Sequence, residues 1–179
     1  STSRRQHQMC IRDSISVICT SPSKTFNLAS MLISNIFIPN RQLKARFRKQ
    51  VDAAGISQLN VLGLTATQAA YTKGEEWYQA MHAYVKENIA YVKQYVAEHL
   101  PGVTVIDGEG TYLVWLDFRA TGIDADELDR RIIYDAKLWL DSGKIFGHTG
   151  RGFQRINVAA PRKVITECFD RIKLIIDKK

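Results

Sequence analysis

The sequence predicts an α/β protein, and three observations carry this prediction. Two β-rich runs, over 15–20 and 31–38, are followed by a basic helical pattern that reaches about residue 54. A second, longer helical pattern runs over 65–99. After it, strand patterns alternate with helical patterns, as in layered α/β folds. The strands are expected near 103–106, 112–118, 137–140 and 153–158, and the helices near 124–135 and 161–176.

Local signals justify the boundaries of these elements. Pro39-Asn40 stops the second strand, and Leu100-Pro101-Gly102 ends the long helix. Gly74 predicts a bend within or just before that helix. Asp124 is a good N-cap for the helix that follows it. The apolar residues of the long helix recur at three-to-five-residue spacing, which indicates a core-facing stripe: Trp77, Met81, Tyr84, Ile89, Val92 and Val96.

A lysine framed by small hydroxyl residues follows the first strand, in Ser21-Pro22-Ser23-Lys24-Thr25-Phe26-Asn27-Leu28-Ala29. A lysine amine can bond to the aldehyde of pyridoxal phosphate only when it is unprotonated, so such a site must lower its pKa. Hydroxyls and backbone N–H groups in a turn between a strand and a helix can donate to the cofactor phosphate. The same short pattern also fits an ordinary turn with a solvated lysine.

A second segment, Gly152-Phe153-Gln154-Arg155-Ile156-Asn157-Val158-Ala159-Ala160-Pro161-Arg162, places an arginine before an Ile-Asn pair. A planar guanidinium can bind an α-carboxylate through two parallel charge-assisted hydrogen bonds, which a lysine cannot reproduce. The side chain of Arg155 has this chemistry. Arg162 is interpreted as a surface arginine on the first turn of the last helix.

Both segments resemble the class I/II aminotransferase superfamily of PLP-dependent enzymes, in its bacterial cystathionine β-lyase (C–S lyase) branch. Two more stretches are similar to that branch: the strand Gly110–Phe118, and the loop Gly143–Gly152, interpreted as a mobile active-site loop. From its residues alone, this strand is predicted to be buried, with Tyr112 and Trp115 in the core. The resemblance covers about 15–179, and the family's enzymes are about twice as long, so it identifies a C-terminal half.

The resemblance implies a fold, a cofactor and a site. Residues 15–64 would be the end of the PLP-binding large domain, 65–100 a bridging helix, and 101–179 an α+β small C-terminal domain. The cofactor would be pyridoxal 5'-phosphate, held by Lys24 with Ser21 and Ser23, and Arg155 would bind the amino-acid substrate. The parent would be a homodimer. Its missing half would hold the groups for the cofactor ring, which leaves this chain alone inactive.

The implied reaction is α,β-elimination on a thioether amino acid such as cystathionine, giving a thiol, pyruvate and ammonia. An amino-acid aminotransferase is the alternative, because it shares the early steps. Many aminotransferases place a phosphate-binding arginine eight residues after the lysine, where this chain has Leu32, and this favours the lyase. A third hypothesis is a non-enzymatic binding or regulatory module in which Lys24 is structural.

The composition and charge of the chain argue against two classes of partner, membranes and nucleic acids. The chain of 179 residues has 45% hydrophobic residues and no apolar run long enough for a bilayer, so no membrane partner is expected. The net charge of +7 is concentrated in the first 50 residues, but the basic run over 41–49 has the pattern of a solvated amphipathic helix, and nucleic acid is not expected.

Three scattered cysteines indicate reduced thiols and a cytoplasmic protein, and the four histidines lack ligand-spaced partners for a metal. Residues 1–14 match nothing in the family and are expected to be disordered or artefactual. Ile33, Ile36 and Ile38, on the second strand, are expected to lack neighbours in this half.

Overall fold

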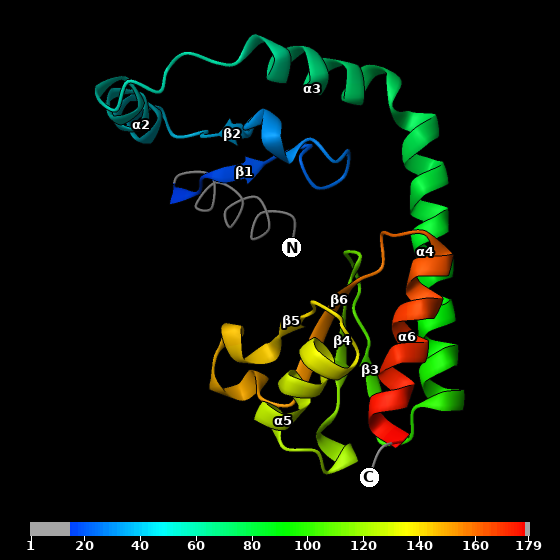
Figure 1. Ribbon diagram of the computed structural model, residues 1–179. Coiled ribbons are helices and arrows are strands. Elements are labelled where there is room, and N and C mark those ends of the chain that lie inside the picture. The colour runs from blue at the N-terminus through cyan, green and yellow to red at the C-terminus, as the bar shows by residue number, and fades with distance from the viewer. Residues whose placement is uncertain (1–14, 178–179) are drawn as a thin grey trace, which may run out of the picture. The chain divides into compact units, whose positions relative to one another are not determined.

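The computed structural model describes residues 15–177 (Figure 1), and the expectation for residues 1–14 lies outside this range. The chain divides into two compact units, the first ending at Ala80 and the second beginning at Met81. The division falls within helix α4 (Glu75–His99). Among the described helices, none is both long enough and apolar enough to cross a membrane.

The first unit begins with a two-stranded antiparallel pair, β1 (Ile18–Thr20) and β2 (Asn35–Phe37). The short 3-10 helix η1 (Ala29–Met31) precedes β2. The strand expected over 31–38 is therefore shorter than predicted. Its beginning is displaced because Leu32 has a φ of 53°, a left-handed backbone that cannot continue a strand.

Helices α2 (Arg41–Ala53) and α3 (Val61–Lys73) complete the first unit together with the start of α4. The side chain of Asn40 caps α2 by accepting hydrogen bonds from the backbone N–H groups of Gln42 and Leu43, at 2.8 and 3.0 Å. The long helix expected over 65–99 is two helices, α3 and α4.

The predicted bend at Gly74 is confirmed, since Gly74 is the break between α3 and α4. A Cβ at this position would overlap the Ala70 carbonyl oxygen and would lie 2.7 Å from Cε1 of Phe26, which leaves no room for a larger residue. The break is thus where the segment that carries Lys24 packs against the helices of the first unit.

The expectation that three isoleucines of the second strand lack neighbours is wrong for two of them. Ile33 and Ile38 are buried within the first unit, and only Ile36 is exposed, at 40%. These two are the buried hydrophobic residues among those that the structure describes in the first unit, whereas the rest of the described core lies in the second. The first unit therefore has little core of its own.

The second unit contains an antiparallel sheet of four strands in the order β3-β4-β6-β5. The strands are β3 (Thr104–Ile106), β4 (Leu113–Asp117), β5 (Asp141–Ser142) and β6 (Phe153–Asn157). The strand predicted at 137–140 is wrong. Lys137 has a φ of 55° and the Leu138 N–H still bonds to the Ile132 carbonyl, so the chain is leaving a helical turn there and pairs only from Asp141.

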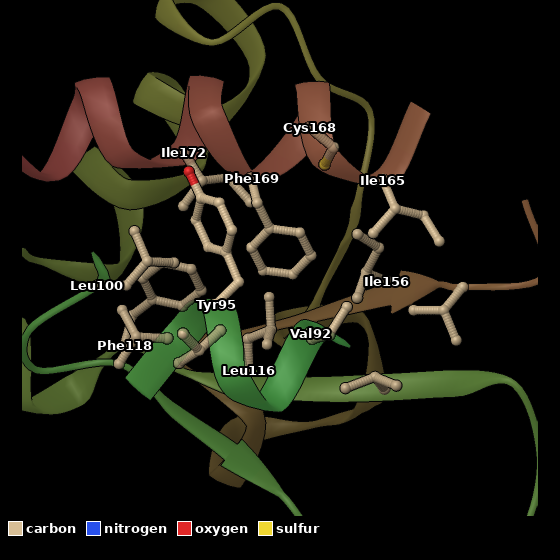
Figure 2. Packing of buried hydrophobic residues seen from close by; sticks show 14 of the residues in the cluster. Val92, Tyr95, Leu100, Leu116, Phe118, Ile156, Ile165, Cys168, Phe169 and Ile172 are labelled. Carbon is tan, nitrogen blue, oxygen red and sulfur yellow. The ribbon is translucent and has the colours of Figure 1, made fainter. Parts of the chain in front are cut away.

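The helical segments of the second unit are the C-terminal part of α4, α5 (Ala125–Arg130), the π-turn η3 (Arg131–Asp135) and α6 (Arg162–Asp177). The predicted cap at Asp124 is confirmed, because its carboxylate accepts from the Asp126 N–H at 2.8 Å. Figure 2 shows the core of this unit, which α4, α6, β4 and β6 share. Val92, Leu116, Phe118, Phe169 and Ile172 are completely buried in it. Burial also raises the pKa of the Cys168 thiol to about 11, which keeps it protonated.

A buried asparagine joins α4 to the chain between β6 and α6. The Asn88 amide donates to the carbonyls of Val158 and Ala160, at 2.9 and 3.0 Å, and its oxygen accepts from Nε of Arg162 at 2.7 Å. The Arg162 guanidinium also lies 4.6 Å from the Tyr91 ring centre. The interpretation of Arg162 as a surface arginine is therefore wrong: it is half-buried and completes the hydrogen bonds of a buried amide, which would otherwise be costly.

An ion-pair cluster on α5 predicts acid sensitivity of the second unit. Hydrogen bonds from Arg130 and Arg131 lower the pKa of Glu127 from its ordinary 4.5 to about 2. A depressed carboxyl pKa contributes stability above the unfolded value, which is lost as pH falls through the folded value. We expect the melting temperature to fall between about pH 4.5 and 2, and Glu127→Gln to flatten that slope in melts followed by circular dichroism. Exposed Glu109, which has no ion-pair partner among the described residues, is the control position: Glu109→Gln should leave the slope unchanged, and an unchanged slope in Glu127→Gln would contradict the prediction.

Candidate functional site

The turn that carries Lys24 is built by the serines before it. Ser21 Oγ donates to the Ile33 carbonyl at 2.7 Å and accepts from the Ser23 N–H at 3.1 Å. The Phe26 N–H closes a helical turn on the Pro22 carbonyl at 2.9 Å. Asn27 ends this turn, because its φ of 54° is left-handed. The expected order of strand, polar turn and helical turn is present, but the helix is a single turn followed by η1.

Donors suited to an anion remain available in this turn. Lys24 is exposed and the Ser23 side chain is half-buried. Among the described residues, the Ser23 hydroxyl and the N–H groups of Lys24 and Thr25 have no hydrogen-bond partner. A hydroxyl and adjacent backbone N–H groups are the donor set that binds phosphate in loops, so these residues fit a phosphorylated cofactor. The Ser21 hydroxyl instead donates to the Ile33 carbonyl, and this hydrogen bond stabilises the turn.

Phe26 anchors the Lys24 turn within the first unit. Its ring stacks on Trp77, with ring centres 5.7 Å apart, and meets the edge of Tyr71 at 6.2 Å. Tyr78 completes this aromatic group at 6.4 Å. Aromatic pairs at these separations are favourable beyond their buried area. The position of Lys24 therefore depends on side chains at the break between α3 and α4.

Arg155 lies on β6 in the second unit, directly opposite Asp141 of β5 and Trp115 of β4. Its Nη2 and Nε atoms donate to Oδ2 of Asp141, at 2.6 and 3.1 Å. Its guanidinium carbon lies 4.5 Å from the centre of the Phe146 ring. Because the side chain is only 24% exposed, these contacts hold it in one arrangement.

Aromatic side chains surround this arginine on the sheet face opposite the main core. Trp115 meets the Phe146 ring edge-on at 5.0 Å and Phe153 at 6.2 Å. Together with Ile106, Thr149 and Gly150 they line an open pocket of about 420 Å³. Trp115 is therefore not in the core, contrary to expectation, because alternate residues of β4 face opposite sides of the sheet. Tyr112 does pack against the core as expected.

The segment expected to be a mobile loop contains two short 3-10 helices, η4 (Gly143–Phe146) and η5 (His148–Gly150). Their backbones approach so closely that a side chain at Gly143 would overlap the Gly150 carbonyl. Lys144 ties η4 to α5 by ion pairs with Asp126 and Asp129. These pairs raise the pKa of Lys144, which disfavours the neutral amine that a bond to an aldehyde requires.

A second aspartate–arginine pair lies on the same face of the sheet. Arg119 Nε and Nη2 donate to the two carboxylate oxygens of Asp117, at 2.9 and 2.7 Å, and its guanidinium lies 4.6 Å from the Phe153 ring centre. These hydrogen bonds lower the pKa of Asp117. The Arg119 side chain is 62% exposed, so it is far more solvated than Arg155.

Lys24 belongs to the first unit and Arg155 to the second. Sequence reasoning missed Asp141, Phe146 and Phe26 as their supporting residues. Only the register of β5 on β6 reveals the pairing of Asp141 with Arg155. Within residues 15–177, no group of three or more His, Cys, Asp or Glu side chains is placed to bind a metal.

Comparison with known proteins gives a consistent result. No protein-family model matches the chain. It is 36% identical over 159 residues to cystathionine β-lyase PatB of Bacillus subtilis, which covers 89% of the chain and 41% of PatB. Cystalysin of Treponema denticola, whose crystal structure contains pyridoxal 5'-phosphate, superposes with a TM-score of 0.88 at 36% identity, over 92% of the chain and 42% of cystalysin. A PLP-bound C–S lyase of Staphylococcus hominis superposes with a TM-score of 0.80 at 32% identity, over 91% and 42% of the two chains.

Over the part of these structures that it spans, the chain therefore has the fold of the PLP-dependent proteins of the aminotransferase class. Within this class its homologues are cystathionine β-lyases and C–S lyases. The expected family and fold class are confirmed. The chain spans about two fifths of the length of these relatives, which agrees with a fragment of a larger protein.

Proposed function

We propose that the chain is part of a PLP-dependent C–S lyase that cleaves thioether amino acids such as cystathionine. The observation that carries the proposal is the joint sequence and structural similarity to cystalysin and PatB across about nine tenths of the chain. Cystathionine and one water would give a thiol amino acid, pyruvate and ammonia. The overall reaction needs no external oxidant or reductant.

Each site residue has a role in this proposal. The Lys24 amine would hold the cofactor through its aldehyde and would be free to act on the substrate once the substrate is bound. The Ser23 hydroxyl and the N–H groups of the turn donate to the phosphate. Ser21 shapes the turn and lies close enough along the chain to share the phosphate once its hydroxyl leaves the Ile33 carbonyl. Arg155 binds the substrate carboxylate through its guanidinium.

The protein's own groups then handle the proton. Once Lys24 is free, its neutral amine takes the proton from the substrate Cα, as a positioned general base. Pyridoxal phosphate, when bound, supplies an electron sink for the charge left at Cα. Arg155 holds the carboxylate so that the Cα–H bond keeps a single orientation, which is the source of a large part of such rate enhancements.

The test uses the complete protein that contains this chain, loaded with pyridoxal 5'-phosphate and supplied with cystathionine. The proposal expects pyruvate, ammonia and a free thiol in equal amounts, without any added keto acid. A requirement for a keto-acid acceptor, with an amino acid as the product, would instead establish an aminotransferase. If the protein neither turned over cystathionine nor bound the cofactor, the hypothesis of a non-enzymatic binding or regulatory module would be favoured.

The aminotransferase alternative rests on a specific observation. A PLP-bound protein of Clostridium difficile described as a putative aminotransferase superposes with a TM-score of 0.88 at 35% identity. Against this, Leu32 occupies the position where many aminotransferases carry a phosphate-binding arginine, and its side chain is 87% exposed. An exposed leucine offers no donor to a phosphate, so the lyase remains the better proposal.

The proposal extends to assembly, location and domains. The complete protein would be a cytoplasmic homodimer, a state that size-exclusion chromatography with light scattering would measure. Residues 15–64 would end its PLP-binding domain, 65–100 would bridge the domains, and 101–179 would form the small domain. Neither nucleic acid nor a membrane is part of the proposed function.

Replacing Arg155 with lysine should damage substrate use far more than cofactor retention. A lysine keeps the charge but cannot form two parallel bonds to a carboxylate, and the loss should cost about 2–4 kcal/mol in kcat/KM. Steady-state kinetics with cystathionine, and cofactor absorbance after gel filtration, would measure the two effects. Unchanged kinetics would remove Arg155 from the site.

A further inference from the structure

We propose that Asp141 is a positioning residue that sets the Arg155 guanidinium for an amino-acid carboxylate. This inference rests on the proposed function and assigns a role to a side chain outside the expected site. Asp141 would not touch the substrate. It would act only through the orientation of Arg155.

The hydrogen bonds between the two side chains define which edge of the guanidinium is used. Asp141 receives both Nε and Nη2 of Arg155 on the single oxygen Oδ2, so it occupies the side edge of the planar group. Nη1 has no hydrogen-bond partner among the described residues. One N–H of Nη1 and the second N–H of Nη2 form the end edge, which is a fork that matches a carboxylate. The aspartate therefore leaves open the edge that a substrate would use.

The faces of the guanidinium are also constrained. Phe146 covers one face at 4.5 Å, and Trp115 supports Phe146 from the β4 side at 5.0 Å. A guanidinium fixed by one edge and one face has few rotamers left. Ordering it before the substrate arrives reduces the entropy lost on binding.

The aspartate has two opposing effects on substrate binding. Its carboxylate orients Arg155, but its negative charge also repels an incoming carboxylate. Asp141→Ala removes both the tether and the charge, whereas Asp141→Asn removes the charge and keeps an oxygen that can accept from Nε and Nη2. A positioning role therefore predicts that the two variants behave differently, since only the alanine frees the guanidinium.

The test uses the complete, PLP-loaded protein and two substrates. One is cystathionine, and the other is cystathionine in which the α-carboxylate proposed to bind Arg155 is replaced by a carboxamide. In Asp141→Ala we expect kcat/KM for cystathionine to fall about tenfold, mainly through KM, with little change for the carboxamide. Asp141→Asn should stay within about threefold of the wild type. Asp117→Ala is the matched control, because it breaks the Asp117–Arg119 pair on the same sheet face. It should leave kcat/KM unchanged for both substrates.

Several outcomes would overturn the inference. Equal losses on both substrates in Asp141→Ala would indicate a structural role, and so would a loss in Asp141→Asn as large as in Asp141→Ala. No loss in Asp141→Ala would show that Arg155 needs no tether. Thermal melts of each variant separate unfolding from mispositioning, and Asp141→Asn keeps the inference falsifiable if Asp141→Ala does not fold.

Arg155→Lys distinguishes the inference from the proposed function. If Arg155→Lys loses its preference for cystathionine over the carboxamide while Asp141→Ala keeps it, only the positioning role fails. If neither variant changes that preference, Arg155 does not bind the substrate carboxylate, and its role in the proposed function fails as well.

Discussion

Replacing Lys24 with alanine in the complete protein should lower turnover by at least about a thousandfold. The proposed reaction uses this amine twice, first as the bond to the cofactor and then as the base at Cα, and loss of a positioned base alone costs about 10²–10⁴-fold. The variant should also lose its covalent hold on the cofactor, because the turn around it retains only hydrogen-bond donors for the phosphate. Lys49→Ala is the control, since Lys49 is an exposed lysine of α2 in the same unit.

Borohydride reduction followed by peptide mapping measures the covalent link directly. The pyridoxyl mass should appear on Lys24 in the wild type and should be absent from the digest of Lys24→Ala. Its appearance on Lys144 or Lys163 would contradict the assignment. Lys144 is a poor competitor because its ion pairs with Asp126 and Asp129 favour the protonated amine.

The elements that the sequence predicted well are those with local signals. Asp124 caps its helix because the carboxylate of an N-cap aspartate can accept from the backbone N–H two residues later, whatever the rest of the sequence. Gly74 breaks the long helical pattern, and the Ala70 carbonyl and the Phe26 ring that lie against it explain why no larger residue fits. These features depend on neighbours within a few residues, or on a residue type that few others can replace.

The predictions that failed depend on contacts distant in sequence. An apolar run at 137–140 has the composition of a strand, but pairing with β6 begins only at Asp141, after the left-handed Lys137. Trp115 has the hydropathy of a core residue, yet its position on β4 turns it to the opposite sheet face. Sheet register, which single-residue preferences do not encode, decides both cases.

The site divides in the same way. Lys24 and Arg155 could be nominated because the segments that carry them resemble those of a known family, whereas the chemistry of the Lys24 segment alone also fits an ordinary turn. Their supporting residues could not, because Asp141 contacts Arg155 from the neighbouring strand and Phe26 contacts Trp77 about fifty residues further along the chain. For Arg162 the sequence-based interpretation is wrong in the opposite direction. An arginine beside a helix start is expected to be solvated, and only the buried amide of Asn88 explains why it is half-buried.

Residues 15–179, taken on their own, should fold in the second unit and show no lyase activity. The second unit has its own sheet, helices and completely buried side chains such as Phe118 and Phe169. Among its described residues, the first unit has only Ile33 and Ile38 as buried hydrophobic residues, and it exposes Ile18, Phe37 and Leu62. Apolar side chains on a short strand pair with open edges favour association with other chains, so self-association of the fragment is expected.

The experiment purifies residues 15–179, adds pyridoxal 5'-phosphate and cystathionine, and compares pyruvate release with that of the complete protein. Hydrogen exchange should show protected amides in β4, β6 and α6 and rapid exchange in β1 and β2, because local stability follows the buried contacts. A partner copy of the fragment should not restore activity, since the resemblance places the remaining cofactor-binding groups outside the chain. Turnover within about tenfold of the complete protein, a barrier difference of only about 1.4 kcal/mol, would show that those groups are dispensable and that the first unit assembles a working site without them.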